Sequence, residues 1–126
     1  MEPSAVFTPN APKPIGPYSQ AVAAGQFLFI SGQIPLDPAS NAIVGLTIGE
    51  QTRQAIKNLK AVLSSQSLGT NSLVKITVFL RSMTDFVPFN RVYEEELAGA
   101  TPARSLVEVS GLPKNVLIEI EAIACR

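Results

Sequence analysis

The sequence contains no histidine and only one cysteine, Cys125. Without histidine, the Ser-His-Asp and Cys-His forms of nucleophilic catalysis are excluded. With one cysteine, an intrachain disulfide is excluded, and so are the zinc sites that cysteine and histidine usually form. Cys125 has no basic neighbour except the terminal Arg126, which favours a buried thiol over a reactive one. We therefore expect a site without a metal.

The common nucleotide-binding and zinc-protease motifs are also missing. The chain has no GxGxxG, no GxxxxGKS/T and no HExxH. Dinucleotide binding, phosphate-loop chemistry and zinc proteolysis therefore have no motif support. No cofactor is expected.

Charged residues are scarce. Asp, Glu, Lys and Arg make up 16% of the chain, against about 25% in typical soluble domains. Their formal net charge of zero lacks the basic surplus with which nucleic-acid-binding proteins neutralise phosphates. A small monomer with so few charges and 46% apolar residues would expose much apolar surface. A homo-oligomer that covers this surface is therefore predicted.

Long apolar runs and targeting signals are absent as well. No window reaches the roughly 18 apolar residues of a membrane span. The first 14 residues contain Glu2 and four prolines, but neither the apolar segment of a signal peptide nor the arginines of a transit peptide. We expect a cytoplasmic protein, and 126 residues favour a single domain over residues 1–126.

Strand and helix patterns follow a proline-rich, extended arm over residues 1–17. The segment Thr47-Ile48-Gly49-Glu50 has the form of a capping box, and the apolar spacing behind it predicts a helix to about Ser67. A second helix is expected from about Asp85 to Leu97, with Pro88 in its first turn. Strands are predicted over Tyr18–Ala24, Phe27–Ser31, Leu73–Leu80, Thr101–Val109 and Val116–Ala124.

The resulting order is β-β-α-β-α-β-β. Because strands and helices do not alternate strictly, we predict an α+β fold with a mixed, mostly antiparallel sheet and both helices on one face. Oligomer contacts are expected on the other face. In the strand Leu73–Leu80, the side chains of Val74, Ile76, Val78 and Leu80 are expected to share a face. The turn Ser110–Asn115 predicts that the last two strands form a hairpin.

This predicted hairpin holds the first candidate functional residues. Arg104 follows Pro102-Ala103, and its planar guanidinium matches the two oxygens of a carboxylate. A surface ion pair is the commoner role for such an arginine. Glu119 and Glu121 are two apart and share a strand face. A solvated face accounts for such a pair more often than a carboxylate that holds a water beside a substrate.

Other candidates flank the first two predicted strands and lie on the second helix. Tyr18 and Ser31 stand beside proline or glycine, where both residue types are common without a function. Gly32 would let a ligand approach the backbone and offers its N–H to an anion. Asn90 and Tyr93 are three apart on a helix, a spacing that usually reflects packing or local hydrogen bonding.

Several segments, in this order, resemble the Rid (YjgF-type) family of reactive-intermediate deaminases. No segment is decisive alone, but together they cover almost the whole chain. They are Ile15-Gly16-Pro17-Tyr18-Ser19-Gln20-Ala21, Ser31-Gly32-Gln33-Ile34-Pro35, Gln51-Thr52-Arg53-Gln54-Ala55 with Asn58-Leu59, Val74–Leu80, Asp85-Phe86 with Asn90 and Tyr93, Pro102-Ala103-Arg104-Ser105 with Val107-Glu108-Val109, Leu112-Pro113, and Ile118–Ala124.

The resemblance implies a chorismate-mutase-like fold and a homotrimer with clefts between subunits. It implies hydrolysis of 2-aminoacrylate, 2-iminopropanoate and 2-iminobutanoate, made by pyridoxal-phosphate enzymes, to 2-oxo acids and ammonia. The arginine after Pro-Ala, here Arg104, marks the deaminating branch of that family. Water already attacks the imine, so fixed positioning supplies rate without a nucleophile or cofactor.

The resemblance also implies roles for single residues. Arg104 would bind the substrate carboxylate, and Glu119 would orient the attacking water. Substrate contacts would come from Tyr18, Ser31, the Gly32 backbone, Asn90 and Leu106. Leu106 stands where several relatives have cysteine, so only its backbone amide offers a polar contact. The hairpin with Arg104 and Glu119 would then be half a site, completed by Tyr18 and Ser31 of the next subunit.

Two other functions stay open on the sequence. One is a non-enzymatic ligand-binding or regulatory protein that uses the same cleft for carboxylates. The other is a ribonuclease or translation inhibitor, which the zero net charge and the missing histidines disfavour.

Overall fold

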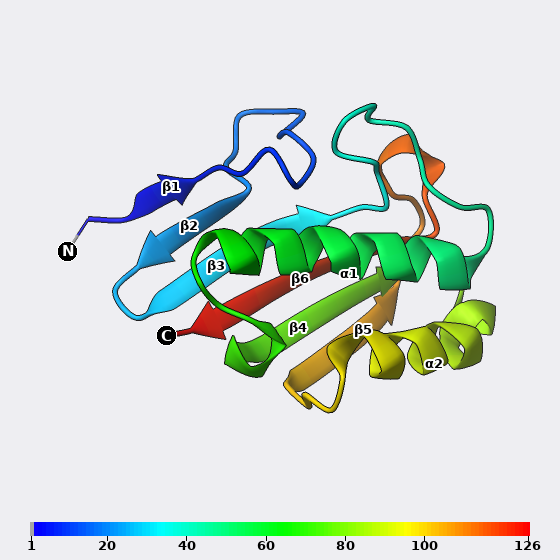
Figure 1. The fold of residues 1–126 in the computed structure, drawn as a ribbon. Helices are drawn as coiled ribbons and strands as arrows, with labels where there is room; N and C mark the ends of the chain where they lie inside the picture. Colours follow the sequence, from blue (N-terminus) through cyan, green and yellow to red (C-terminus); the bar gives the residue numbers. More distant parts are fainter. Residues whose placement is uncertain (1) are drawn as a thin grey trace.

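The computed structural model describes residues 2–126, which form one mixed sheet and two α-helices (Figure 1). Short 3-10 helices lie at Thr70–Ser72, Met83–Asp85 and Pro113–Asn115. The strands and α-helices follow in the order β1 (Ser4–Val6), β2 (Ala21–Ala24), β3 (Phe27–Gln33), α1 (Ile48–Ser65), β4 (Leu73–Leu80), α2 (Phe86–Leu97), β5 (Ala103–Glu108) and β6 (Ile118–Cys125).

Helix α1 begins where the sequence predicts it. The Thr47 hydroxyl accepts a hydrogen bond from the Glu50 backbone N–H, and the Glu50 carboxylate accepts one from the Thr47 N–H, which completes the capping box. The helix ends at Ser65, two residues before the predicted end, and Ser67 then has a φ of 58°. Helix α2 ends at Leu97, and Ala98 turns the chain with a φ of 50°.

The six strands lie in the order β1-β2-β3-β6-β4-β5. Every neighbouring pair is antiparallel except β4 and β5, which are parallel. The predicted mixed, mostly antiparallel sheet is therefore confirmed. Strand β1 was not predicted, because its three residues lie inside the proline-rich segment that was expected to be an extended arm.

The predicted hairpin of the last two strands is wrong. Strand β6 lies between β3 and β4, while β5 pairs in parallel with the far side of β4. The connection from β4 through α2 to β5 is a crossover, which produces a parallel pair. Strand β6 alternates buried residues with mostly half-buried ones, whereas β5 has no fully buried residue. This difference in burial is the one expected between a central strand and an edge strand.

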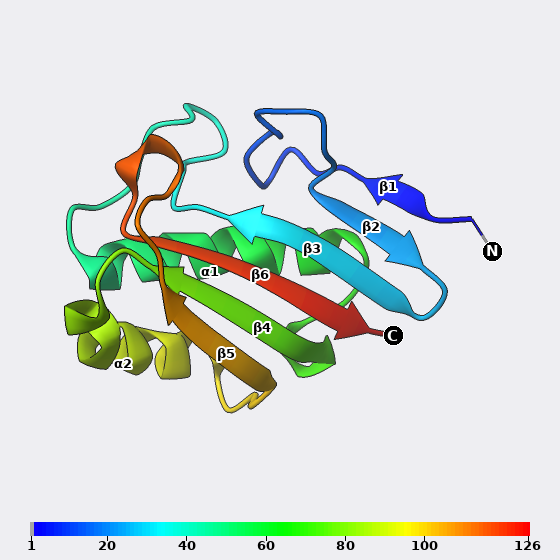
Figure 2. The same ribbon diagram turned by 180° about the vertical axis from the view of Figure 1, so that it is seen from behind.

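Both helices cover one face of the sheet and leave the other uncovered (Figures 1 and 2). This arrangement confirms the predicted layers. The main core lies between the helices and the covered face and includes Leu28, Ile56, Leu59, Ile76, Phe89 and Ile120. On the uncovered face, the Phe27 and Phe29 side chains are each almost half exposed, and their ring centroids lie 6.1 Å apart.

Val74 does not share the buried face of β4 with the other three residues predicted to lie there. Ile76, Val78 and Leu80 are buried, but Val74 is 43% exposed. The register of β4 against β6 shifts between Leu73 and Lys75, so Leu73 takes the buried position that the alternation assigned to Val74.

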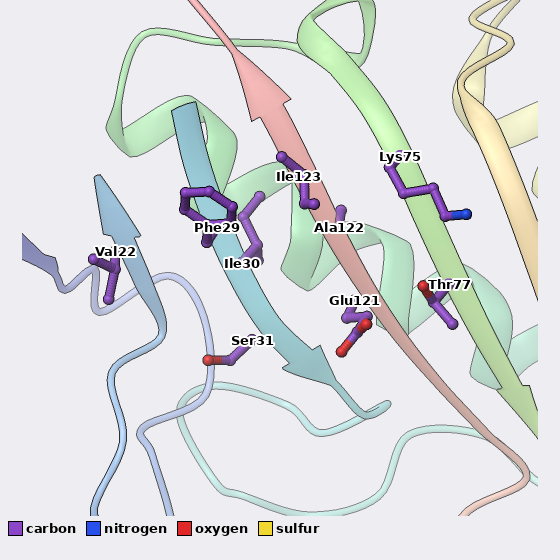
Figure 3. A pocket seen from close by; sticks show the side chains of 9 residues that line it. All are labelled: Val22, Phe29, Ile30, Ser31, Lys75, Thr77, Glu121, Ala122 and Ile123. Atoms are coloured by element: carbon purple, nitrogen blue, oxygen red, sulfur yellow. The ribbon is translucent and has the colours of Figure 1, made fainter. Parts of the chain in front are cut away.

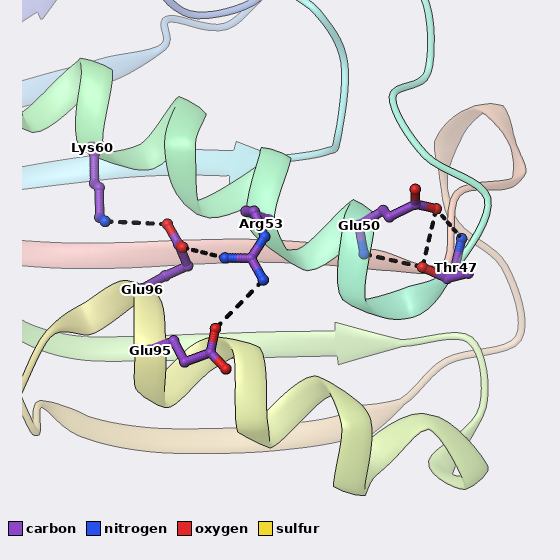
Figure 4. Close-up of polar contacts among 6 residues, drawn as sticks. All are labelled: Thr47, Glu50, Arg53, Lys60, Glu95 and Glu96. Carbon is purple, nitrogen blue, oxygen red and sulfur yellow. Dashed lines mark hydrogen bonds and ion pairs between the residues drawn. The ribbon is translucent and has the colours of Figure 1, made fainter.

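Ion pairs join the two helices on the outer surface (Figure 4). Arg53 of α1 contacts Glu96 at 2.6 Å and Glu95 at 3.5 Å, and Lys60 contacts Glu96 at 3.3 Å. Such exposed pairs add little stability each, but together they help fix the position of α2 relative to α1. Neither helix is long and apolar enough to cross a membrane, within residues 2–126.

Candidate functional site

Arg104 lies in β5, the edge strand beside α2. Its Nη1 atom donates a hydrogen bond of 2.7 Å to Oδ1 of Asn90 in α2. The register places Arg104 opposite Ile76, which is fully buried under the helices. Residues in register on neighbouring strands point to the same face. Arg104 therefore lies on the helix-covered side of the sheet, at its edge.

Three aromatic rings of α2 form a platform for the Arg104 guanidinium. Its Cζ atom lies 4.8 Å from the Tyr93 ring centroid, 5.7 Å from that of Phe89 and 5.9 Å from that of Phe86. A guanidinium attracts and stacks on aromatic faces. Within residues 2–126, no carboxylate lies within ion-pair distance of Arg104, so the ion pair favoured on sequence alone is not formed there.

A hollow of about 280 Å³ opens beside Arg104. Asn90, Tyr93 and Glu94 line one side of it, and the chain from Gly99 to Pro102 lines the other. The Tyr93 hydroxyl is buried and lies close to the Arg104 guanidinium, although the contact falls short of a full hydrogen bond. Burial raises the pKa of Tyr93, and the positive charge and the hydrogen-bonding contact of Arg104 act against this shift. The hollow thus presents a cation on an aromatic platform.

Glu119 lies on the opposite face of the sheet, in β6. It pairs in register with Phe79, and its neighbours Ile118 and Ile120 point into the core. Its carboxyl group occupies the space that a side chain at Gly32 would take: a Cβ there would overlap a carboxylate oxygen and lie 2.7 Å from Cδ. Burial, and next the charge of Glu121, raise the pKa of Glu119. A carboxylate with a raised pKa is a better proton acceptor.

Ser31 and Tyr18 lie on the Gly32 side of the molecule. Residues 31 and 32 fall in a register shift between β3 and β6. The Ser31 hydroxyl donates a 2.6 Å hydrogen bond to the Ser19 carbonyl. The Tyr18 hydroxyl accepts a 3.3 Å hydrogen bond from the Ile15 N–H. Tyr18 also lines a small hollow of about 30 Å³ with Gly32.

The candidate residues therefore form two groups rather than one. The first, which we call the arginine group, contains Arg104, Asn90 and Tyr93. The second, the glutamate group, contains Glu119, Gly32, Ser31 and Tyr18. The predicted grouping of Arg104 with Glu119 is wrong within one chain, because their strands do not pair and their side chains lie on opposite faces.

Leu106 and Glu121 belong to neither group. The Leu106 side chain packs against the core below α2, which leaves only its backbone for a ligand. Glu121 lines a hollow of about 300 Å³ on the uncovered face with Ser31, Lys75 and Thr77 (Figure 3). Of the predicted site residues, only Ser31 lines this hollow.

The sequence prediction missed the aromatic platform. The apolar spacing of α2 puts Phe86, Phe89 and Tyr93 on one helix face, where packing is the usual role. Asn90, four residues after Phe86 and three before Tyr93, lies on the same stripe. An amide within an aromatic stripe was the available signal, but its partner Arg104 is 14 residues away in the chain.

The chain matches a family model over residues 8–126, described as Endoribonuclease L-PSP. It is 57% identical over 121 residues to a RutC family protein of Pyrococcus horikoshii, covering 96% of each chain. It is 45% identical over 124 residues to a 2-iminobutanoate/2-iminopropanoate deaminase of Salmonella typhimurium, again with 96% of each covered. Among solved structures, E. coli TdcF with bound serine superposes with a TM-score of 0.92, at 40% identity and 98% coverage of each chain.

These matches span nearly the whole chain, at identities well above those at which only a fold is shared. The fold, with two helices on one face of a six-stranded mixed sheet, is that of the solved E. coli TdcF. The chain belongs to the Endoribonuclease L-PSP family, also known as the YjgF/RutC/Rid family.

Proposed function

We propose that this protein is a hydrolytic deaminase of reactive 2-enamine and 2-imine acids, with its site formed between two copies of the chain. The substrates would be 2-aminoacrylate, 2-iminopropanoate and 2-iminobutanoate. The observation that carries the proposal is the Arg104 guanidinium, which is held by α2 but has no carboxylate partner within residues 2–126. A planar carboxylate is the ligand that such a fork fits best.

The site requires two copies because its two groups lie apart. Arg104 and Glu119 are separated by two strand spacings of about 4.8 Å and by three residues of about 3.3 Å, which gives roughly 14 Å between their Cα atoms. A three-carbon or four-carbon acid cannot bridge this distance across a sheet. The arginine group of one copy facing the glutamate group of the next is a head-to-tail contact, which closes into a ring. We expect the ring to be a trimer.

In this site each group performs one part of the hydrolysis. Arg104 binds the carboxylate of the imine. Glu119 accepts a proton from a water as the water oxygen forms a bond to the imine carbon, and the C=N electron pair moves to nitrogen. Glu119 then returns this proton to nitrogen, which gives a carbinolamine. It next accepts the hydroxyl proton and passes it to the amino nitrogen as the C=O bond forms, so the C–N bond breaks and ammonia and the 2-oxo acid leave. Positioning and one proton acceptor suffice for this reaction.

A coupled assay tests the proposal. Threonine dehydratase generates 2-iminobutanoate, and the release of 2-oxobutanoate is followed with and without this protein. We expect a faster release with the wild-type protein and no acceleration with Arg104→Ala. Equal acceleration by this variant would remove Arg104 from the site.

The same assay separates the alternatives. A carboxylate ligand that binds at Arg104 while the imine hydrolyses at its spontaneous rate would indicate a binding or regulatory protein. The family description also includes endoribonuclease activity. RNA cleavage that survives purification and disappears with Arg104→Ala would favour this second alternative.

A further inference from the structure

We infer that Asn90 and Tyr93 are positioning residues, which act on the ligand only through Arg104. The inference rests on the proposed function, and it differs from the expectation that Asn90 contacts the substrate. In this view Arg104 contacts the ligand carboxylate, while Asn90 and Tyr93 keep the guanidinium in place. The evidence is the hydrogen bond from Arg104 to Asn90 and the contact of Arg104 with the Tyr93 ring.

The spacing of four residues in α2 places them on one side of the helix. Phe86, Phe89, Asn90 and Tyr93 lie at positions i, i+3, i+4 and i+7, which form one stripe along a helix. The Arg104 side chain crosses this stripe from β5, with its Cζ atom closest to Tyr93, at 4.8 Å from the ring centroid. The rings therefore hold the guanidinium close to the surface of α2.

Arg104 donates one hydrogen bond to Asn90. A guanidinium has five N–H donors, and Asn90 accepts from one of them, on Nη1. This bond adds a directional contact that the rings do not supply, and it leaves four donors for a carboxylate. Asn90 is an exposed residue, yet its Oδ1 atom is already engaged by Arg104. Its acceptor is therefore committed to the arginine before a ligand arrives.

A carboxylate of the same chain lies near Arg104 and would compete with a ligand for it. Glu94 lines the same hollow as Arg104, but the two form no ion pair. An arginine released from Asn90 would be free to turn toward this carboxylate, and its charge would then be partly neutralised. Holding Arg104 on Tyr93 and Asn90 keeps the cation available to a ligand, which is a preorganised site.

The ring of Tyr93 is the part to which this role is assigned. The hydroxyl makes no full hydrogen bond among residues 2–126, but it lies close enough to Arg104 for the guanidinium to oppose the rise in its pKa. Tyr93→Phe keeps the ring and removes the hydroxyl, and Tyr93→Leu removes the π face as well. We expect Tyr93→Leu to bind 2-oxobutanoate about fivefold to tenfold more weakly than Tyr93→Phe, and equal binding by the two variants would overturn the role of the ring.

A double-mutant cycle on the intact protein tests Asn90. The dissociation constant of 2-oxobutanoate is measured by ligand-observed NMR for the wild type, Asn90→Ala, Arg104→Ala and the double variant. We expect Asn90→Ala alone to weaken binding about tenfold, and to add nothing in the Arg104→Ala background. Asn71→Ala is the matched control, because Asn71 is exposed and lies in the 3-10 helix Thr70–Ser72, outside both groups.

The outcomes separate this inference from the proposed function. Unchanged binding in Arg104→Ala overturns both. Weaker binding in Arg104→Ala with unchanged binding in Asn90→Ala overturns only the role of Asn90. An equal effect of Asn90→Ala in both backgrounds means that Asn90 contacts the ligand directly, and it overturns the inference as well. Thermal unfolding midpoints confirm that each variant is folded, and the Asn90 cycle stands if Tyr93→Leu does not fold.

Discussion

Arg104 and Glu119 lie on opposite faces of one sheet, two strands apart. The arginine rests on α2, and the glutamate fills the space beside Gly32. The arginine group holds a cation without a carboxylate partner among residues 2–126. The glutamate group holds a carboxyl group whose pKa is raised. The proposed reaction, which needs a bound carboxylate and a proton acceptor, would therefore require two copies of the chain. The following experiments test the two halves and their combination.

Gly32→Ala should reduce turnover by displacing Glu119. The added Cβ would overlap the carboxylate oxygen of Glu119, and a flexible carboxyl group can move aside without unfolding the chain. A catalytic group misplaced by about 1 Å can cost on the order of a hundredfold in rate. We expect a loss of this order in kcat in the dehydratase-coupled assay.

Gly111→Ala is the control for this variant. A Cβ at Gly111 meets no atom within 4 Å, so the substitution leaves both groups undisturbed and turnover should be unchanged. If Gly32→Ala kept full turnover, the Glu119 carboxyl group would not need its present position.

Glu119→Gln should make the protein more stable at pH 7 while abolishing its turnover. The pKa of Glu119 is raised above its ordinary value of 4.5 in the folded chain, so the folded state holds this proton more tightly than the unfolded state. The free energy of unfolding therefore falls as the pH rises from the unfolded pKa to the folded pKa, the loss is complete above the folded pKa, and it is absent below the unfolded pKa. Glutamine lacks this ionisation.

Denaturant unfolding at several pH values checks the sign. The free energy of unfolding of Glu119→Gln should exceed that of the wild type at pH 7, and the difference should shrink as the pH falls below 4.5. A variant less stable than the wild type at pH 7 would show that the ionised carboxylate is stabilised in the folded chain, against the assigned cause of the shift.

The Tyr93 ionisation reports on Arg104. The chain has two tyrosines and no tryptophan, so Tyr18→Phe leaves Tyr93 as its only phenol, and absorbance at 295 nm follows its titration. Burial should give a pKa above 10. Adding Arg104→Met should raise this pKa further, because methionine still covers the ring but removes the positive charge. An unchanged or lower pKa would mean that the guanidinium does not lie over Tyr93 in solution.

The helices and the sheet class could be predicted because their signals are local. Thr47 and Glu50 are three residues apart, and the apolar spacing of α1 covers a continuous stretch. The position of β6 could not be predicted in this way. Its neighbours β3 and β4 lie far from it in the chain, and the turn before it suggested a local hairpin with β5. In the fold, one face of β6 is fully buried and the other is mostly half-buried, as suits a central strand.

The candidate site also has features that the sequence could predict and features that it could not. The residue type at Arg104 suggested carboxylate binding, although a surface ion pair was the commoner role, and the water-orienting role of Glu119 came from the resemblance to the Rid family. Their separation follows from strand order and from which face each residue occupies, and neither is visible without the correct topology. Asn90 and Tyr93 could be read as one helix stripe, but their contact with Arg104 joins α2 to β5 across a loop. Residue types indicate the chemistry, while the tertiary arrangement decides which residues act together.

Complementation between two inactive variants tests the shared site most directly. Arg104→Ala retains the glutamate group, and Glu119→Gln retains the arginine group. A site is then intact only where an arginine group from the Glu119→Gln chain faces a glutamate group from the Arg104→Ala chain. In a random 1:1 mixture, about one site in four meets this condition for any closed ring of head-to-tail contacts.

The measurement is the rate of 2-oxobutanoate release after the two variants are unfolded together and refolded as a mixture. Each variant refolded alone is the control and should be inactive. We predict that the mixture recovers about a quarter of the wild-type rate. A mixture no more active than its components would contradict a site shared between copies.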